Sequence, residues 1–134
     1  MRQRLFPAAL ARIDAHQRRD EAVVLVTGSL RPIVAPLAAA VGATDCVAAE
    51  LEQRGGAYSG ALAHGPLAGE RKAAAVSDWI ALHGLDAGAC HAYADSLDDI
   101  PMLRRVGLAH VVNASPKLAR IAAAEGWDTL RWRA

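Results

Sequence analysis

The stretch "ADSLDDIPML", residues 94–103, places three carboxylates within five positions: Asp95, Asp98 and Asp99. The apolar run "ACHAYA" that precedes it indicates a buried strand. A carboxylate directly after such a strand faces the crevice where open parallel sheets bind ligands. Its oxygens suit Mg²⁺, a hard cation that keeps waters and bridges to phosphate. The alternative is that Asp95, Ser96 or Asp98 only caps the helix that follows, and both interpretations stay open here.

A second polar group, Thr27, Gly28 and Ser29, ends the apolar run "AVVLVTG". A small hydroxyl residue and a glycine between a strand and a helix can present backbone N–H groups to an anion, and Thr27 can add a hydroxyl donor. No G-K-[ST] follows and no G-x-G-x-x-G is present, so neither a P-loop nor a dinucleotide fingerprint applies. An ordinary strand-to-helix turn explains the same residues and is the favoured interpretation when this motif is taken alone.

Lys72 stands near the start of a helix predicted over residues 69–83. The helix dipole disfavours a cation there, unless the ammonium holds an anion. A surface lysine is the alternative interpretation. The histidines form no triad with a serine, and His91, inside a predicted strand, is expected to be a packed residue. No G-x-S-x-G is present, so a hydrolase nucleophile elbow is unsupported.

Predicted strands alternate with predicted helices along the chain, which indicates an open, mainly parallel α/β sheet in a single domain, residues 1–134. In such a sheet both polar groups follow strand ends, where ligands bind. The expected strands are residues 22–28, 89–95, 108–113 and 127–132, with two short extended pieces around Gly55–Gly56 as a hairpin. The expected helices are residues 7–18, 32–42, 69–83, about 98–105, and 116–126 with Ser115 as its cap.

The composition excludes several classes of protein. Fifteen basic and fourteen acidic residues give a net charge of +1, so no basic field points to nucleic acid. No apolar run approaches the length of a membrane span, and the first residues lack a signal-peptide pattern. Cys46 and Cys90 have no metal-ligand spacing and are expected to be buried free thiols. We therefore expect a cytoplasmic protein.

Taken in order, these signals resemble the haloacid dehalogenase superfamily, and most of all its phosphoserine-phosphatase-like branch. Thr27 matches the family's second motif, a residue that binds the transferring phosphoryl group. Lys72, in "AGERKAAAV", matches the third, a lysine that neutralises phosphate and nucleophile. Asp95 and Asp99 match the fourth, usually G-D-S-x-x-D-x-P-M-L, in which the first Asp holds Mg²⁺ and the second supports the site. Ala94 stands where that motif usually has glycine.

The resemblance implies a Rossmann-like three-layer sandwich and a Mg²⁺-dependent phosphomonoester hydrolase that works through an aspartyl-phosphate. The expected substrate is a small phosphorylated metabolite. The residues it implies are Lys72 and Asp99 for catalysis, Thr27, Gly28, Ser29 and Lys72 for phosphate, and Asp95 and Asp99 for the metal.

One departure from the family pattern changes the expected function. The family's first motif, D-x-D-x-T, supplies the nucleophile and the general acid–base, yet no D-x-D occurs in this sequence. Too few residues precede Thr27 for that strand and the family's cap. The chain thus resembles the C-terminal part of such an enzyme, without the central strand between those ending at Gly28 and Asp95. We expect little or no Mg²⁺ binding, no turnover alone, and open sheet edges that a second chain could fill.

Three other functions stay open. One is a non-catalytic protein that binds phosphorylated ligands or a partner chain. Another is a non-functional product of a truncated reading frame. A nucleotide-binding Rossmann module is the third, and the missing glycine fingerprint argues against it.

Overall fold

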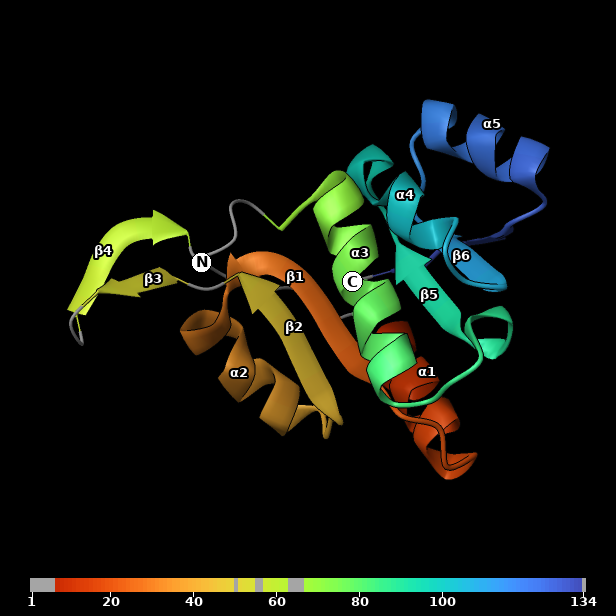
Figure 1. The fold of residues 1–134 in the computed structure, drawn as a ribbon. Helices are drawn as coiled ribbons and strands as arrows, with labels where there is room; N and C mark the ends of the chain where they lie inside the picture. Colours follow the sequence, from red (N-terminus) through yellow and green to blue (C-terminus); the bar gives the residue numbers. More distant parts are fainter. Residues whose placement is uncertain (1–6, 50, 55–56, 63–66, 134) are drawn as a thin grey trace. The chain divides into compact units, whose positions relative to one another are not determined.

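The computed structural model describes residues 7–49, 51–54, 57–62 and 67–133 (Figure 1). The chain forms two compact units, which we call unit 1 (Met1–Leu67 with Arg133–Ala134) and unit 2 (Ala68–Trp132). The single domain expected over residues 1–134 stays a prediction.

Unit 1 begins with a helix, a strand, a helix and a strand: α1 (Pro7–Arg18), β1 (Val24–Leu30), α2 (Arg31–Ala40) and β2 (Asp45–Ala49) (Figure 1). β1 and β2 are parallel. Val34 and Ala38 of α2 pack in one apolar cluster with Cys46 and Ala48 of β2. The predicted helix over residues 7–18 is confirmed at both ends, and α2 follows its prediction within two residues.

The region predicted as two extended pieces around Gly55–Gly56 forms three strands instead. β3 (Leu51–Arg54) and β4 (Ala57–Leu62) pair antiparallel, which confirms the predicted hairpin, although its turn lies outside the described residues. The first strand, β2, pairs with β1 and not within the hairpin. Its small side chains at Cys46, Ala48 and Ala49 are buried, so β2 is a core strand. The prediction was therefore wrong in merging β2 with the hairpin.

Unit 2 repeats the alternation of helices and strands, as predicted. Its strands run parallel in the order β5-β6-β7. Its elements are α3 (Gly69–Leu82), the 3-10 turn η1 (Ala87–Ala89), β5 (His91–Ala94), the 3-10 turn η2 (Leu97–Asp99), α4 (Ile100–Leu103), β6 (Leu108–Val112), α5 (Pro116–Glu125) and β7 (Asp128–Leu130). The helix expected over residues 98–105 is thus divided between η2 and α4.

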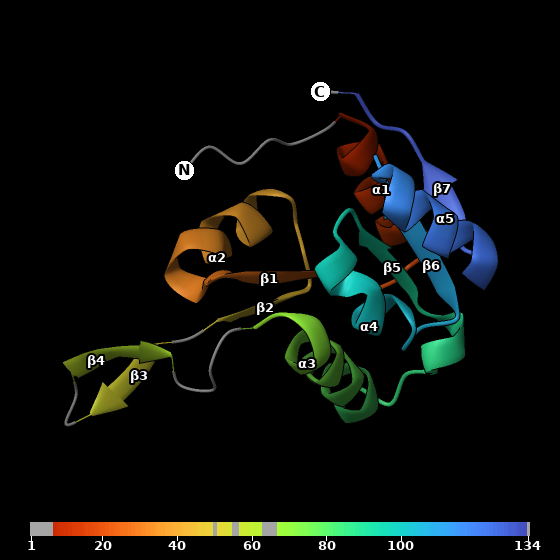
Figure 2. The ribbon, with the colours of Figure 1, turned by 90° about the horizontal axis from the view of Figure 1, so that it is seen from above.

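Helices α4 and α5 cover one face of this sheet (Figure 2). Both crossovers step in the same direction along the strand order, and right-handed crossovers then place both helices on one side. Leu103 of α4, Leu118 of α5 and Val111 of β6 are fully buried there. As predicted, the Ser115 hydroxyl caps α5 by accepting from the Leu118 N–H at 3.2 Å.

Each parallel sheet ends on an edge strand that belongs to the predicted site. In the part of the chain that the structure describes, β1 pairs with β2 alone, and β5 pairs with β6 alone. The resemblance implied two open edges, and the absence of a central strand between them stays a prediction. None of the described helices has the length and apolar character needed to cross a membrane.

The two thiols are free, and they differ in burial. Cys46 is buried, as predicted, whereas Cys90 is half-buried, and its Sγ donates to the Asp86 carbonyl at 3.2 Å. Desolvation raises the pKa of both thiols, and the Asp86 carboxylate adds to the rise in the pKa of Cys90. Both cysteines are therefore protonated near neutral pH and poor nucleophiles.

We expect Leu118→Ala to lower the free energy of unfolding by about 2–5 kcal/mol, because it leaves a cavity between α5 and the sheet. Leu118 is 0% exposed, whereas Leu82 is 82% exposed. The matched control Leu82→Ala is expected to change that free energy by less than about 0.5 kcal/mol. Urea unfolding followed by circular dichroism measures both. Equal losses in the two variants would contradict this placement of the core.

Candidate active site

Asp95 directly follows β5, at the carboxyl end of a parallel strand. Its neighbour Ala94 is buried, while Asp95 itself is exposed. Among the residues that the structure describes, no side chain or backbone group forms a hydrogen bond or an ion pair with its carboxylate. An exposed carboxylate without a partner, at this end of a strand, is free to hold a cation or a ligand.

The cap of the following turn is Ser96, which decides between the two interpretations of the acidic stretch. The Ser96 hydroxyl accepts from the Asp98 N–H at 3.2 Å, and its carbonyl accepts from the Asp99 N–H at 3.1 Å. The capping alternative is therefore right for Ser96 and wrong for Asp95 and Asp98. Asp95 is left available for chemistry.

Asp99 turns inward and meets Lys72. The Lys72 Nζ lies 2.8 Å from Asp99 Oδ1, and the two side chains are only 14% and 12% exposed. The residues are 27 apart in sequence, and helix α3 brings them together by packing against η2 and α4. Ala73, next to Lys72, is fully buried, and its small side chain allows this close packing. The alternative of a surface lysine is wrong.

A charge pair shielded from water attracts far more strongly than an exposed one, so the two side chains fix each other's position. The carboxylate also offsets the unfavourable dipole that Lys72 meets near the start of α3. The ammonium retains two further N–H donors. A fixed cation with free donors, held by Asp99 of the loop that also carries Asp95, can receive an anionic oxygen.

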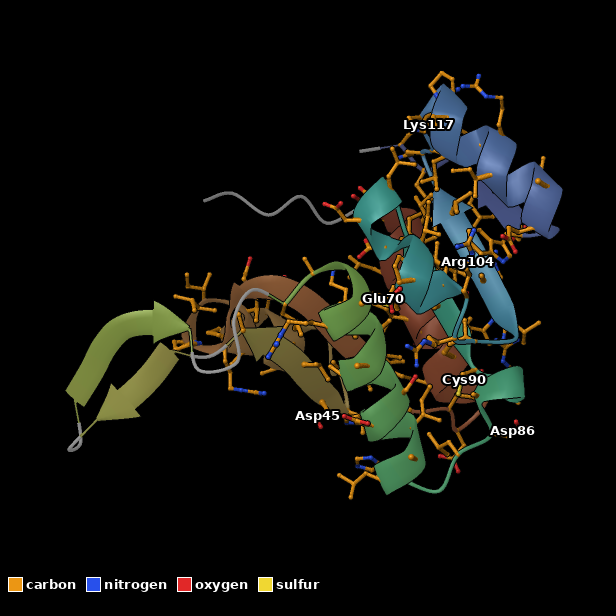
Figure 3. The ribbon with its side chains drawn as sticks, turned by 45° about the horizontal axis from the view of Figure 1, so that its top comes forward. Asp45, Glu70, Asp86, Cys90, Arg104 and Lys117 are labelled. Atoms are coloured by element: carbon orange, nitrogen blue, oxygen red, sulfur yellow. The ribbon has the colours of Figure 1, made fainter. Side chains whose placement is uncertain are left out.

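Arg105 is a third residue of this region, and the sequence did not single it out. It donates from Nη1 to the Ser77 hydroxyl at 3.2 Å, and its Nη2 lies 3.5 Å from Glu70 Oε2. Glu70 lies in the first turn of α3 (Figure 3). Arg105 therefore ties the segment after α4 to the helix that carries Lys72. No local pattern could have found it, because its partners meet it only after packing.

Thr27, Gly28 and Ser29 form a bulge near the end of β1, in unit 1. Thr27 pairs with Ala48, and the next pair is Leu30 with the adjacent Ala49, so Gly28 and Ser29 are looped out. β1 therefore continues to Leu30, and the prediction that it ends at Gly28 was wrong.

The Thr27 hydroxyl holds this bulge. Its Oγ1 accepts from the Ser29 N–H at 3.1 Å, which leaves the hydroxyl proton free to donate. A Cβ on Gly28 would lie 3.1 Å from the Leu67 carbonyl oxygen, so glycine permits a close backbone approach there. The bulge can thus offer a hydroxyl donor beside an exposed glycine.

The predicted site residues divide between the two units. Thr27, Gly28 and Ser29 belong to unit 1, and Lys72, Asp95 and Asp99 belong to unit 2. The structure brings Lys72 and Asp99 into contact and places Asp95 on the same loop. The union of both groups in one site stays a prediction.

His91 is packed, as expected, and it does so against a second histidine. Its Nδ1 lies 2.9 Å from His110 Nε2, with the rings nearly parallel. His110 in turn lies 2.7 Å from an oxygen of Asp128.

The comparisons with known proteins agree with this fold. A family model described as haloacid dehalogenase-like hydrolase matches residues 1–104. A probable phosphatase of Mycobacterium tuberculosis is 39% identical over 126 residues, 94% of this chain and 44% of that protein. A phosphoserine phosphatase of the same organism is 32% identical over 118 residues, 88% of this chain and 38% of that protein. The chain thus spans less than half the length of these two relatives.

Solved structures give the same result. A Bordetella pertussis protein of unknown function matches with a TM-score of 0.81 at 33% identity, over 91% of this chain and 56% of that one. A phosphoserine phosphatase in its apo form matches with a TM-score of 0.71 at 22% identity, over 92% of this chain and 59% of that one. The predicted Rossmann-like α/β fold class is confirmed.

We expect Lys72→Met to lower the free energy of unfolding by about 2 kcal/mol, because it leaves the carboxylate of Asp99 shielded and unpaired. The double variant Lys72→Met with Asp99→Asn should recover part of this loss, since the stranded charge is gone. Urea unfolding at neutral pH measures the three proteins.

The matched control is an exposed ion pair of the same unit. Arg104 Nη2 lies 2.9 Å from Glu125 Oε1, with side chains 56% and 36% exposed. Arg104→Met should cost less than about 1 kcal/mol. An equal cost for Arg104→Met and Lys72→Met would mean that the Lys72–Asp99 pair is not shielded from water.

Proposed function

Since this chain belongs to the haloacid dehalogenase-like hydrolases, we propose that it carries the phosphate- and metal-binding part of a phosphomonoester hydrolase for a small phosphorylated metabolite. The observation that carries the proposal is the shielded pair between Lys72 of α3 and Asp99 of the loop on which Asp95 has no described partner. Helix α3 thereby supplies a cationic hydrogen-bond donor for phosphate, Lys72, and the loop after β5 supplies an anionic ligand for a metal, Asp95.

Asp95 is the proposed metal ligand, and its donor chemistry fits Mg²⁺. Mg²⁺ takes oxygen ligands, keeps several waters, and needs only one or two protein carboxylates alongside substrate phosphate. Bound there, it would withdraw charge from phosphate oxygens. Asp99 has one oxygen engaged by Lys72, so its direct role is to hold that ammonium, and its second oxygen can support the metal and its waters.

Each unit supplies one proposed donor for phosphate. Lys72 offers the N–H groups that Asp99 does not use. Thr27 offers its hydroxyl proton, with Gly28 and Ser29 beside it in the bulge of β1. An ammonium that donates to a phosphate oxygen offsets the negative charge that repels a nucleophile, and a hydroxyl can donate a hydrogen bond to such an oxygen.

The covalent step requires a carboxylate nucleophile that these residues do not provide. The aspartyl-phosphate route needs an Asp free to attack phosphorus, with a second carboxylate to move the proton. No D-x-D pair occurs in the 134 residues, and Asp95 and Asp99 are committed to metal and lysine. We therefore propose that the chain binds but does not turn over a phosphomonoester unless such a carboxylate is supplied.

The free, protonated thiols suit a reducing cytoplasm, which we propose as the location of the protein.

Mg²⁺ binding, which we expect to be weak in this chain alone, is tested by titrating the chain with Mg²⁺ in the presence of inorganic phosphate, by calorimetry. Asp95→Asn should weaken Mg²⁺ binding at least about tenfold, because one charged ligand is lost. Asp98→Asn is the matched control, since Asp98 is exposed on the same loop and the charge change is the same. It should change the affinity less than about twofold. Equal effects would show that only the net charge of the loop matters.

Turnover is tested with p-nitrophenyl phosphate and Mg²⁺, alongside the intact mass of the native protein from its source cells. The 14.1 kDa chain should hydrolyse no faster than its Asp95→Asn variant. Turnover by the 14.1 kDa chain that Asp95→Asn abolishes would overturn the proposed need for an outside carboxylate. Phosphate and Mg²⁺ binding by a native protein of that same mass, without turnover, would instead favour a non-catalytic phosphate-binding protein.

A further inference from the structure

Asn113, the only asparagine of the chain, stands where the backbone leaves β6. Its backbone lies in the left-handed region, at φ 49, which asparagine tolerates better than most residues. Its N–H donates to the Leu130 carbonyl at 2.9 Å, so the ladder between β6 and β7 ends on this residue. Because β5 and β6 are parallel, Asn113 follows its strand at the same edge of the sheet as Asp95 follows β5.

The side-chain amide of Asn113 holds the backbone of Trp132, which lies two residues beyond the end of β7. Its Oδ1 accepts from the Trp132 N–H at 2.8 Å, and its Nδ2 donates to the Trp132 carbonyl at 3.0 Å. Two residues of antiparallel strands exchange both bonds in the same way. The amide thus takes the place of a peptide group, and it fixes the segment after β7 at two points.

An amide is the side chain of this size that fits such a pairing. A backbone N–H can only donate and a carbonyl can only accept, so their partner must offer one acceptor and one donor side by side. An ionised carboxylate accepts at both oxygens, so it would lose the bond to the carbonyl and place a negative charge against the carbonyl oxygen. Glycine tolerates the left-handed backbone but offers neither group.

The Trp132 side chain reaches from this attachment over β6 to β5. Its ring lies 6.0 Å from the Tyr93 ring, at an interplanar angle of 28°. Because the strand order is β5-β6-β7, a residue after β7 that meets Tyr93 spans the sheet (Figure 2). Tyr93 precedes Asp95 by two residues, the spacing of side chains on one face of an extended chain. Among the described residues β5 pairs with β6 alone, so this ring contact adds support near the end that carries Asp95.

We propose that Asn113 is a positioning residue of the candidate metal site: its amide holds Trp132 against Tyr93, and this contact keeps the end of β5 in place. The inference rests on the proposed function only for the use of Asp95 as a metal ligand. A ligand that is held before the cation arrives loses less conformational freedom on binding. Residues that hold a metal ligand without touching the metal strengthen metal binding in this way.

The test combines ¹⁵N relaxation of the unliganded 134-residue chain with hydrogen exchange of the Trp132 amide. In Asn113→Gly that amide should exchange at least about tenfold faster, because its acceptor is removed. The order parameter of the Asp95 amide should fall from about 0.85, typical of rigid backbone, toward about 0.6. Trp132→Ala should lower this order parameter equally. The double variant should lower it no further, because both changes interrupt the same set of contacts.

A second substitution separates the hydrogen bonds of Asn113 from its backbone conformation. Asn113→Asp keeps the acceptor and the tolerance of a positive φ but loses the donor at neutral pH. It should therefore behave like Asn113→Gly, and it serves if the latter folds poorly. The matched control is Arg131→Ala, because Arg131 is exposed in the same segment as Trp132. This control should leave both measurements unchanged.

Equal order of the Asp95 amide in Asn113→Gly and in the unsubstituted chain would overturn the proposal. So would a Trp132 amide that stays protected in Asn113→Gly, or losses of order that add in the double variant. These measurements contain neither metal nor phosphate, so their result does not depend on whether Asp95 binds Mg²⁺. That question is decided separately, by the calorimetric titration of Asp95→Asn.

Discussion

The ion pair between Lys72 and Asp99 is the interaction on which the candidate site of unit 2 depends. It joins a helix to a loop that lies 27 residues further along the chain. Because both side chains are largely shielded from water, neither charge can be removed without stranding the other. The pair also determines which carboxylate of the loop can bind a ligand. Asp99 is engaged by Lys72 and Ser96 caps the turn, so the carboxylate of Asp95 stays free at the strand end.

Elements with strong local signals could be predicted from the sequence. Helix α5 has a serine cap, a proline in its first turn and a glycine at φ 77 after its end, and each signal acts within a few residues. β2 could not be predicted in the same way. Its alternating small residues suit a hairpin as well as a core strand, and only its pairing with β1 decides between them. The bulge at Gly28 and Ser29 depends on the same partner.

The residue types of the candidate site could be predicted from the sequence, but the contacts between these residues could not. Asp95 and Asp99 follow a predicted strand, Lys72 stands near the start of a predicted helix, and these residue types suit Mg²⁺ and phosphate. That Lys72 contacts Asp99 depends on how α3 packs against η2 and α4, which no local pattern contains. Arg105 and the pairing of His110 with Asp128 were missed for that reason. The pairing of His110 with Asp128 requires a register of β6 on β7 that the sequence of each strand does not specify.

The two sheet edges are the places where a strand that carries the proposed outside carboxylate would pair. Among the described residues, β1 and β5 each pair along one edge, and the other edge is open. Each strand has a part of the candidate site at its carboxyl end. Strands that pair in parallel end at the same edge of a sheet, where ligands bind. A parallel strand added to β5 would therefore bring its own carboxyl end beside Asp95, and one added to β1 would bring it beside Thr27. An aspartate at that position would supply the nucleophile, and the hydrogen bonds of the new ladder would satisfy the open edge.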